Sequence, residues 1–205
     1  MRGCYRQRVI AKRERWVHVY EFGVGEESAA GDLDLLSEEE QVRARCIRDP
    51  ARRSRFVARR AALREILSAY TCEVCRSCSD SHDVAVVAIA PRPVGVDIEV
   101  ERPRRQELIA QRMFAPDERS VLEAVEGDQR RHLFHRCWVA KEAYAKGLGQ
   151  GLAMRFDEFS VAPALRSPQG TGAVGEGWTV TVSTDGGRHL AVAAEGDDWE
   201  VVRVG

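Results

Sequence analysis

Two short apolar runs, joined by a proline-containing turn, constrain the fold more than any other part of this sequence. The first, residues 84–90, is a continuous run of small apolar side chains, and the second, residues 94–100, has valine or isoleucine at every second position. Runs of this length and composition predict buried strands. Because only Pro91-Arg92-Pro93 separates them, we predict a strand–turn–strand hairpin at the centre of the first half of the chain.

Helices and further strands are predicted on both sides of these runs. Ser37, followed by three glutamates, is a capping-box start for one helix, and Pro50 suits the first turn of another that runs to about Tyr70. Further helices are predicted at 104–113, from 116 and at 130–146. The remaining strands are predicted at 16–22, 156–161, 178–183, 189–194 and 199–204, with loops at 71–83 and 163–177.

Each half of the chain therefore contains helices followed by strands. We predict an α+β fold of two similar lobes, a pseudo-dimer in which helices pack on a small antiparallel sheet in each lobe. The N-terminal lobe would be residues 1–102 and the C-terminal lobe 103–205, with the active site between them. A chain of 205 residues is long enough for this arrangement, since folding at this size buries roughly 70% of the unfolded surface.

Charge and hydropathy exclude several classes of protein. The formal net charge of −1 gives no global attraction to nucleic acid or to a membrane surface. The N-terminus begins with a charged run and not with the apolar segment of a secretory signal. No apolar stretch approaches the ~20 residues of a membrane-spanning helix. We expect a cytoplasmic protein that acts as a monomer.

A split pair of charged motifs carries the candidate chemistry. Asp97 and Glu99 lie two residues apart on a predicted strand, so they project from one face. Glu142 and Lys146 are i,i+4 neighbours on a predicted helix. Taken singly, these pairs could be a solvated strand face and a surface salt bridge of small worth. Together, two carboxylates that repel unless a cation lies between them and a nearby ammonium favour a Mg²⁺ site with phosphate chemistry.

Arginines supply most of the positive charge, and nine of them fall between residues 43 and 64, where Asp49 is the only acid. Most of this stretch is expected to be the solvated face of a helix. One or two of these guanidinium groups are expected to contact an anionic ligand, because their planar fork suits phosphate.

Cysteines form a second cluster. Cys72, Cys75 and Cys78, followed by His82, give the spacing C-x2-C-x2-C-x3-H. Three thiolates and an imidazole could hold zinc, or the thiolates part of an iron–sulfur cluster. The alternative is a loop of free thiols.

The split motif also carries a resemblance. Gly95-Val96-Asp97-Ile98-Glu99, followed by Trp138-x-x-Lys141-Glu142-Ala143-x-x-Lys146, resembles the signature of the 4′-phosphopantetheinyl transferases, and the two-lobed length points to the Sfp-like subclass. Segments 36–40, 55–64, 114–118 and 146–152 are similar to family segments as well. The resemblance covers most of residues 16–195.

The resemblance implies transfer of 4′-phosphopantetheine from coenzyme A to a serine of an apo acyl or peptidyl carrier protein, with release of 3′,5′-ADP. Such enzymes serve fatty acid, polyketide or nonribosomal peptide biosynthesis. By matching positions, Asp97, Glu99 and Glu142 would hold Mg²⁺. Glu142 would take the proton of the attacking serine, and Lys146 would neutralise or protonate the departing phosphate.

The resemblance further implies that Arg55 contacts coenzyme A, with Arg48, Ser79, His82 and Lys141 as additional binding residues. The donor pocket departs from the family pattern. No Gly-Lys-Pro loop precedes residue 84, and residues 79–81 read Ser-Asp-Ser where the family has Ser-His-Ser. His82 is the candidate to replace the missing histidine. Val139 stands where the family has a small hydroxyl or thiol residue. The alternative function is therefore a non-catalytic carrier-binding or regulatory module on the same fold.

Overall fold

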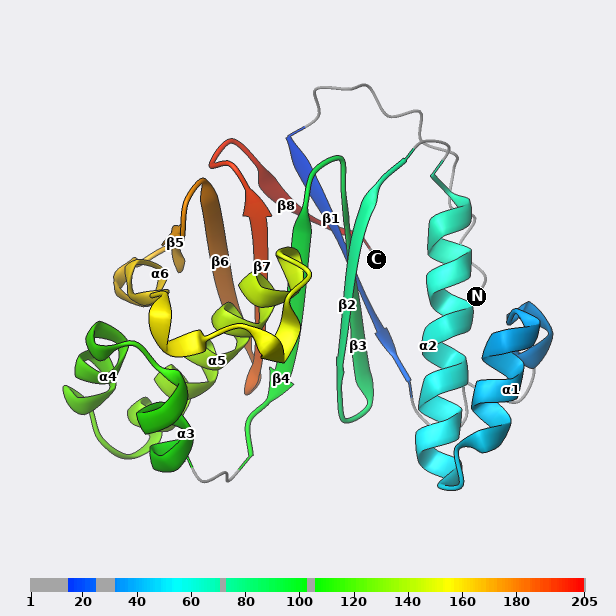
Figure 1. Cartoon of the computed structure of the whole chain (residues 1–205), viewed down its shortest axis with the longest axis horizontal. Coiled ribbons are helices and arrows are strands. Elements are labelled where there is room, and N and C mark those ends of the chain that lie inside the picture. Colours follow the sequence, from blue (N-terminus) through cyan, green and yellow to red (C-terminus); the bar gives the residue numbers. More distant parts are fainter. Residues whose placement is uncertain (1–14, 25–31, 71–72, 103–105, 205) are drawn as a thin grey trace.

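The computed structural model describes residues 15–24, 32–70, 73–102 and 106–204. It confirms the predicted α+β class, with two four-stranded sheets that each have helices on one side (Figure 1). In spatial order, the first sheet consists of β2 (Cys75–Ser81), β3 (Val84–Ala90), β1 (Trp16–Gly23) and β8 (Glu200–Val204). The second consists of β4 (Val94–Val100), β7 (Arg188–Glu195), β6 (Trp178–Asp185) and β5 (Thr171–Val174).

One long helix packs on each sheet. The first sheet is accompanied by α1 (Glu38–Cys46) and α2 (Pro50–Ser68), and the second by α3 (Gln106–Met113), α4 (Pro116–Glu123), α5 (Gly127–Gly147) and α6 (Ala162–Arg166). The predicted capping box of α1 is present, because the Glu40 N–H donates to the Ser37 hydroxyl and the Ser37 N–H donates to the Glu40 carboxylate. Short 3-10 turns lie at Asp32–Leu35, Gly151–Ala153 and Phe156–Glu158.

The two sheets pack against each other through a shared apolar core. Val17 and Val19 of β1 contact this core from one side, and Val96 and Ile98 of β4 from the other. Successive side chains of a strand point to opposite faces. Asp97, between Val96 and Ile98, therefore projects from the opposite face of β4, as the sequence predicted. In the structure this face packs against α5.

The predicted hairpin is wrong, although both of its strands exist. β3 and β4 lie in different sheets, because the turn between them carries the chain from one sheet to the other. β3 pairs with β1 and β2, whereas β4 pairs antiparallel with β7. The last strand, β8, returns to the first sheet and pairs parallel with β1, so that sheet is not wholly antiparallel. Each sheet thus takes one strand from the other half of the chain.

Three local predictions also need correction. The predicted loop at 71–83 contains β2, and the predicted loop at 163–177 contains most of α6 and all of β5. The predicted strand at 156–161 is absent: Phe156–Glu158 form a 3-10 turn, and Phe156 and Phe159 contact Trp138 and Tyr144, respectively. Within the described ranges, no helix is long and apolar enough to cross a membrane.

Candidate active site

The candidate site begins where β4 meets α5. Gly95 faces the helix, and a Cβ atom at this position would collide with the Ala143 carbonyl oxygen and the Gly147 backbone nitrogen. Only glycine allows the two backbones to approach this closely. The close contact brings the next residue on the same face of β4, Asp97, alongside the C-terminal turns of α5.

Asp97 is the centre of a compact polar cluster. The Lys146 ammonium lies 2.7 Å from Asp97 Oδ1, and the Ser79 hydroxyl donates to the same oxygen at 2.6 Å. Lys146 also donates to Ser79 Oγ at 2.9 Å. Burial raises the pKa of the Asp97 carboxyl, Lys146 and Ser79 act to lower it, and the nearby Glu99 raises it further. The net direction is upward, so Asp97 lacks part of the positive charge that would fully compensate its burial.

The second oxygen of Asp97 shows what could supply that charge. Asp97 is only 4% exposed, and its Oδ2 atom has no hydrogen-bond partner among the described residues. A buried carboxylate oxygen without a partner is costly. An oxygen-seeking cation such as Mg²⁺ would satisfy it, so the residues present fit a metal ion at this position.

The serines of β2 position the carboxylates of β4. Ser81 donates to Glu99 Oε2 at 3.1 Å and accepts the Val100 N–H at 3.2 Å. Ser77 likewise accepts the Val96 N–H at 3.1 Å. β2 and β4 are both edge strands, and these hydroxyls take the place of backbone pairing between them. The alternating serines of β2 therefore join the two sheets and hold Asp97 and Glu99 in register.

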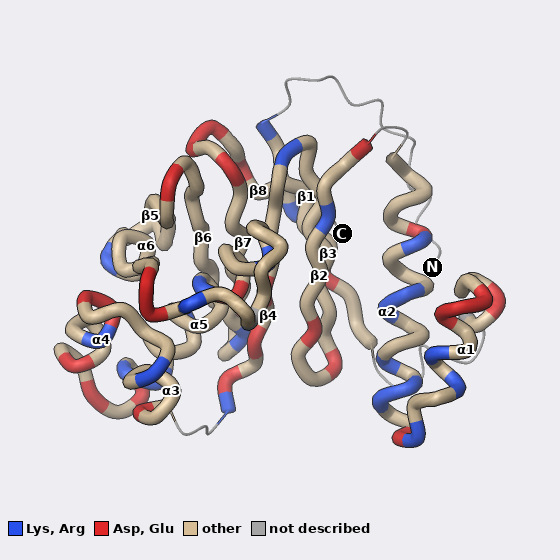
Figure 2. The backbone as a smooth tube through the Cα atoms, viewed as in Figure 1, with Lys and Arg blue, Asp and Glu red and all other residues tan. Residues whose placement is uncertain are grey.

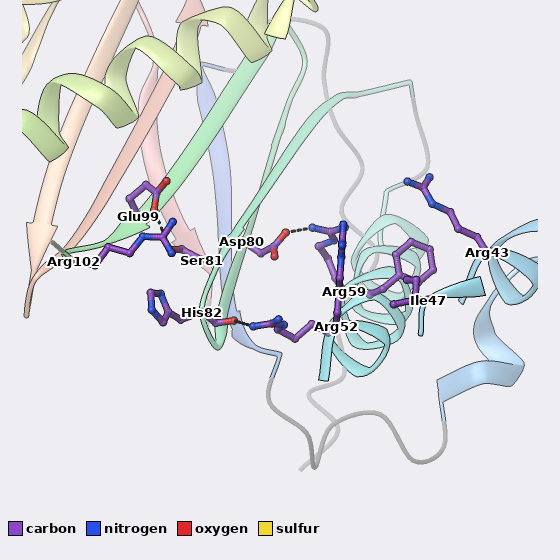
Figure 3. A pocket seen from close by; sticks show the side chains of 11 residues that line it. Arg43, Ile47, Arg52, Arg59, Asp80, Ser81, His82, Glu99 and Arg102 are labelled. Atoms are coloured by element: carbon purple, nitrogen blue, oxygen red, sulfur yellow. Dashed lines mark hydrogen bonds and ion pairs between the residues drawn. The ribbon is translucent and has the colours of Figure 1, made fainter. Parts of the chain in front are cut away.

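A cavity of about 500 Å³ opens beside Glu99, between α2, the β2–β3 turn and the end of β4 (Figure 3). It is strongly basic, since the arginines outnumber the acids five to two. The charged residues that line it are Arg43, Arg52, Arg55, Arg59, Arg102, Asp80 and Glu99, with His82 at the turn. The basic groups along α1 and α2 are visible in Figure 2. A cavity of this size and charge suits a ligand with several phosphates.

Asp80, which stands where the resemblance led us to expect histidine, points into this cavity toward Arg59 (Figure 3). The two side chains form an ion pair. Asp80 leaves β2 on the side opposite to Ser79 and Ser81, because neighbouring strand residues alternate. The Ser-Asp-Ser segment thus sends its hydroxyls to β4 and its carboxylate to an arginine of α2.

Comparison with known proteins gives the family. A sequence model described as the 4′-phosphopantetheinyl transferase superfamily matches residues 93–193. This part of the chain belongs to that superfamily. It contains Asp97, Glu99, Glu142 and Lys146, whereas most of the arginines that line the cavity precede it.

Individual relatives agree with the family. The chain is similar to the 4′-phosphopantetheinyl transferase HetI of a Nostoc species, with 28% identity over 90% of each protein. It is 41% identical to a 4′-phosphopantetheinyl transferase of Bacillus subtilis over 37% of this chain and 34% of that one. A holo-(acyl-carrier-protein) synthase from Bacillus anthracis, solved with coenzyme A, matches 51% of this chain and 96% of its own with 21% identity. Its TM-score of 0.43 is too low to inform the site.

The two lysines that the phosphopantetheinyl transferase signature places on α5 lie in different environments. Lys146 reaches Asp97, and Glu142 is half-buried one helical turn before it on α5. Lys141 is fully buried on another side of the helix. Its ammonium lies 2.7 Å from Glu118 and donates to the Phe159 carbonyl oxygen at 2.7 Å. Lys141 was predicted to bind coenzyme A, but in this position it links α5 to α4.

Of the other residues predicted to bind the donor, two line the cavity and two do not. Arg55 and His82 line the cavity, and Arg55 Nη1 donates to the His82 carbonyl oxygen at 3.5 Å. Ser79 is buried behind the cavity wall and serves Asp97 and Lys146. Arg48 is exposed between α1 and α2 and is not among the cavity-lining residues.

The structure does not support the predicted cysteine metal site. Cys72 lies outside the described residues. Cys75 and Cys78 are three positions apart in the regular strand β2, so their side chains leave opposite faces. Both are exposed, free thiols. Two ligands on opposite faces of one strand cannot converge on one ion, and this holds for zinc and for an iron–sulfur cluster.

Sequence reasoning missed four cavity arginines and the hydroxyl of Ser81, which donates to Glu99. Arg43, Arg52 and Arg59 belong to the basic stretch from which only one or two contacts were expected, and Arg102 follows β4. Spacing along α2 could have indicated part of this set. Positions 52, 55 and 59 are three and four residues apart, so they share one face of a helix.

Proposed function

We propose that this chain transfers 4′-phosphopantetheine from coenzyme A to a serine hydroxyl of an apo acyl or peptidyl carrier protein and releases 3′,5′-ADP. The observation that carries the proposal is the position of the arginine-lined cavity. It ends at Glu99, next to the Asp97–Lys146 pair. A polyphosphate held in the cavity could therefore present its reacting diphosphate to the carboxylates and the ammonium.

The cavity arginines would bind the phosphates of coenzyme A by bidentate hydrogen bonds. Arg55 and His82 line the same wall, which suits contact with the 3′-phosphate end of the donor. Asp80 reduces the charge of this wall by pairing with Arg59. The donor would then be held by fewer uncompensated arginines than the count alone implies.

In the reaction, the serine oxygen of the carrier protein attacks the phosphorus next to the pantetheine arm. The bond from that phosphorus to the bridging oxygen breaks, and 3′,5′-ADP leaves with the bonding electrons. Glu142 accepts the serine proton as general base. Lys146 stabilises the departing phosphate, to which it can turn from Asp97. Mg²⁺ held by Asp97, Glu99 and Glu142 would neutralise charge on the phosphate oxygens.

The test is incubation of the protein with coenzyme A, Mg²⁺ and a panel of apo acyl and peptidyl carrier proteins, read by intact mass. The proposal expects a carrier mass gain of one phosphopantetheine group and an equal amount of 3′,5′-ADP. Carrier binding without any mass gain across the panel would instead favour the non-catalytic module. A carrier mutated from serine to alanine at its attachment site is the matched control.

A further inference from the structure

Three side chains of types that can bind metals meet just beyond the end of β4, next to Glu99. Glu101 follows β4, His132 lies on α5 and His189 lies on β7. The Glu101 Oε1 atom is 3.0 Å from His189 Nε2 and 3.3 Å from His132 Nδ1. One ligand atom from each residue lies within 4.8 Å of the other two. Within the described ranges, this is the one such group of three.

The histidine on β7 is held as a metal-bound histidine usually is. His189 is fully buried, and its Nδ1 atom is 3.0 Å from the hydroxyl of Thr184, its partner across the β6–β7 ladder. An outer hydrogen bond of this kind fixes the ring and its tautomer, and it leaves Nε2 to face an ion. The His135 ring stacks on His189 with centroids 5.5 Å apart and restrains the ring further.

The carboxylate is fixed by its backbone as well as by its side chain. The Glu101 N–H donates to the Gly187 carbonyl oxygen at 2.8 Å, which extends the β4–β7 ladder to this residue. Among the described residues, Arg131 is the one arginine or lysine within ion-pair distance of this carboxylate, at 3.8 Å from Oε2. Oε1, the oxygen nearest both imidazoles, is thus available on the side where they converge.

We propose that Glu101, His132 and His189 form a binding site for a first-row transition cation of the zinc type. Two imidazoles and one carboxylate are a ligand set that Zn²⁺ accepts, whereas Mg²⁺ prefers oxygen ligands alone. His132 is 41% exposed at its side chain, so a water molecule can complete a tetrahedral shell from the solvent side.

The three residues are not ligands of the proposed magnesium site, but they adjoin it, because Glu99 is the ladder partner of His189. His132 lies ten residues before Glu142 on α5, which is about 15 Å along a helix. A bound ion would tie β4, α5 and β7 together. Two of these elements, β4 and α5, carry the carboxylates and the ammonium of the transfer site, so the ion would stabilise the framework that holds them.

The test uses the full-length protein, dialysed against chelator and then kept in excess Mg²⁺ to saturate oxygen-only sites. Zn²⁺ binding is measured by calorimetry, and Co²⁺ binding by the visible absorption typical of tetrahedral cobalt. The proposal expects one equivalent of Zn²⁺, a rise in Tm with Zn²⁺ and a tetrahedral Co²⁺ spectrum. Thr184→Val should weaken binding about 10–100-fold, and His132→Ala should weaken it further.

Matched controls separate this site from the other candidates. His82→Ala removes an exposed histidine from the arginine-lined cavity, and Asp97→Asn alters the magnesium site; both should bind Zn²⁺ as the unmodified protein does. Glu101→Gln keeps the shape of the side chain, so weaker Zn²⁺ binding by this variant cannot be attributed to misfolding. Absence of Zn²⁺ binding would overturn the proposal, as would binding that survives His132→Ala or that is lost in Cys75→Ser.

Discussion

The Lys146 ammonium lies 2.7 Å from Asp97 Oδ1, and this ion pair joins the two charged motifs of the split pair. Lys146 lies on α5 and Asp97 on β4, and the two residues are 49 positions apart in the sequence. Ser79 closes the group by contacting both. Lys146 therefore contacts one oxygen of the carboxylate that we propose as a magnesium ligand, and the other oxygen is buried and without a hydrogen-bond partner among the described residues.

The close approach of β4 to α5 at Gly95 predicts that the packing of these two elements depends on glycine at this position. Gly95→Ala should lower the free energy of unfolding by about 1–3 kcal/mol, because the new methyl group meets the backbone of α5. Urea denaturation measures the change. Gly23→Ala is the control, since its Cβ would lie 3.9 Å from the nearest atom, the Asp83 carbonyl oxygen. Equal stability of the two variants would contradict the described packing of β4 on α5.

The buried position of Lys141 predicts a structural role. Lys141→Ala should lower the free energy of unfolding by about 3–5 kcal/mol, because it leaves Glu118 buried without its cation. The double variant Lys141→Met with Glu118→Gln should recover part of that loss, because it removes the buried charge and keeps a carbonyl acceptor for the backbone N–H groups of Ala115 and Val161. Urea denaturation of the single and double variants tests this. A Lys141→Ala protein of unchanged stability that binds coenzyme A poorly would instead support the donor-binding role predicted from the sequence.

The Arg59–Asp80 ion pair predicts that Asp80 weakens donor binding. Asp80→Ser should release Arg59 for a phosphate and tighten binding of 3′,5′-ADP by about fivefold, which corresponds to about 1 kcal/mol. Calorimetry at low and high salt measures the effect, which should shrink as salt screens it. Asp83→Ser is the control, because this exposed acid follows the same turn but is not among the cavity-lining residues. Weaker binding by Asp80→Ser would show that Asp80 helps to hold the donor.

Glu40 predicts a dependence of stability on pH. Partial burial acts to raise the pKa of this carboxyl, but the Ser37 N–H and Arg64 outweigh it and lower the pKa below the ordinary value of 4.5. A lowered folded-state pKa contributes stability above pH 4.5 that disappears as the pH falls through the folded value. Glu40→Gln should therefore cost about 1 kcal/mol at pH 7 and nothing below the folded-state pKa.

Denaturation of the unmodified and Glu40→Gln proteins across this pH range measures that difference. Glu39→Gln, at the neighbouring exposed position, should change stability much less. A cost for Glu40→Gln that does not shrink as the pH falls would mean that it does not arise from the charge of Glu40.

The sequence predicted those parts of the fold in which local pattern and tertiary environment agree. The apolar runs of β3 and β4 and the capping box of α1 are examples. Strand partners were not predictable, because pairing depends on which sheet a strand enters after its turn. β2 was missed because its residues are polar on both faces, and one face meets the β4 carboxylates while the other meets the arginines of α2.

The site was predictable to the same extent. Spacing was enough to place Asp97 and Glu99 on one face of a strand. It could not separate Lys141 from Lys146, because both lie in one short motif and only the packing of α5 against α4 shows which of them is buried. The Glu101–His132–His189 group was invisible, since its members are spread over 88 positions and share no local motif.

The central claim is that Asp97 and Glu142 serve one transfer reaction, and the most direct measurement is the rate of mass gain of a carrier protein with coenzyme A and Mg²⁺. The account predicts that Asp97→Asn and Glu142→Gln each lower this rate at least about 100-fold. Asp185→Asn, at the exposed last residue of β6, should react as the unmodified protein does. Full transfer activity in both Asp97→Asn and Glu142→Gln would contradict the account.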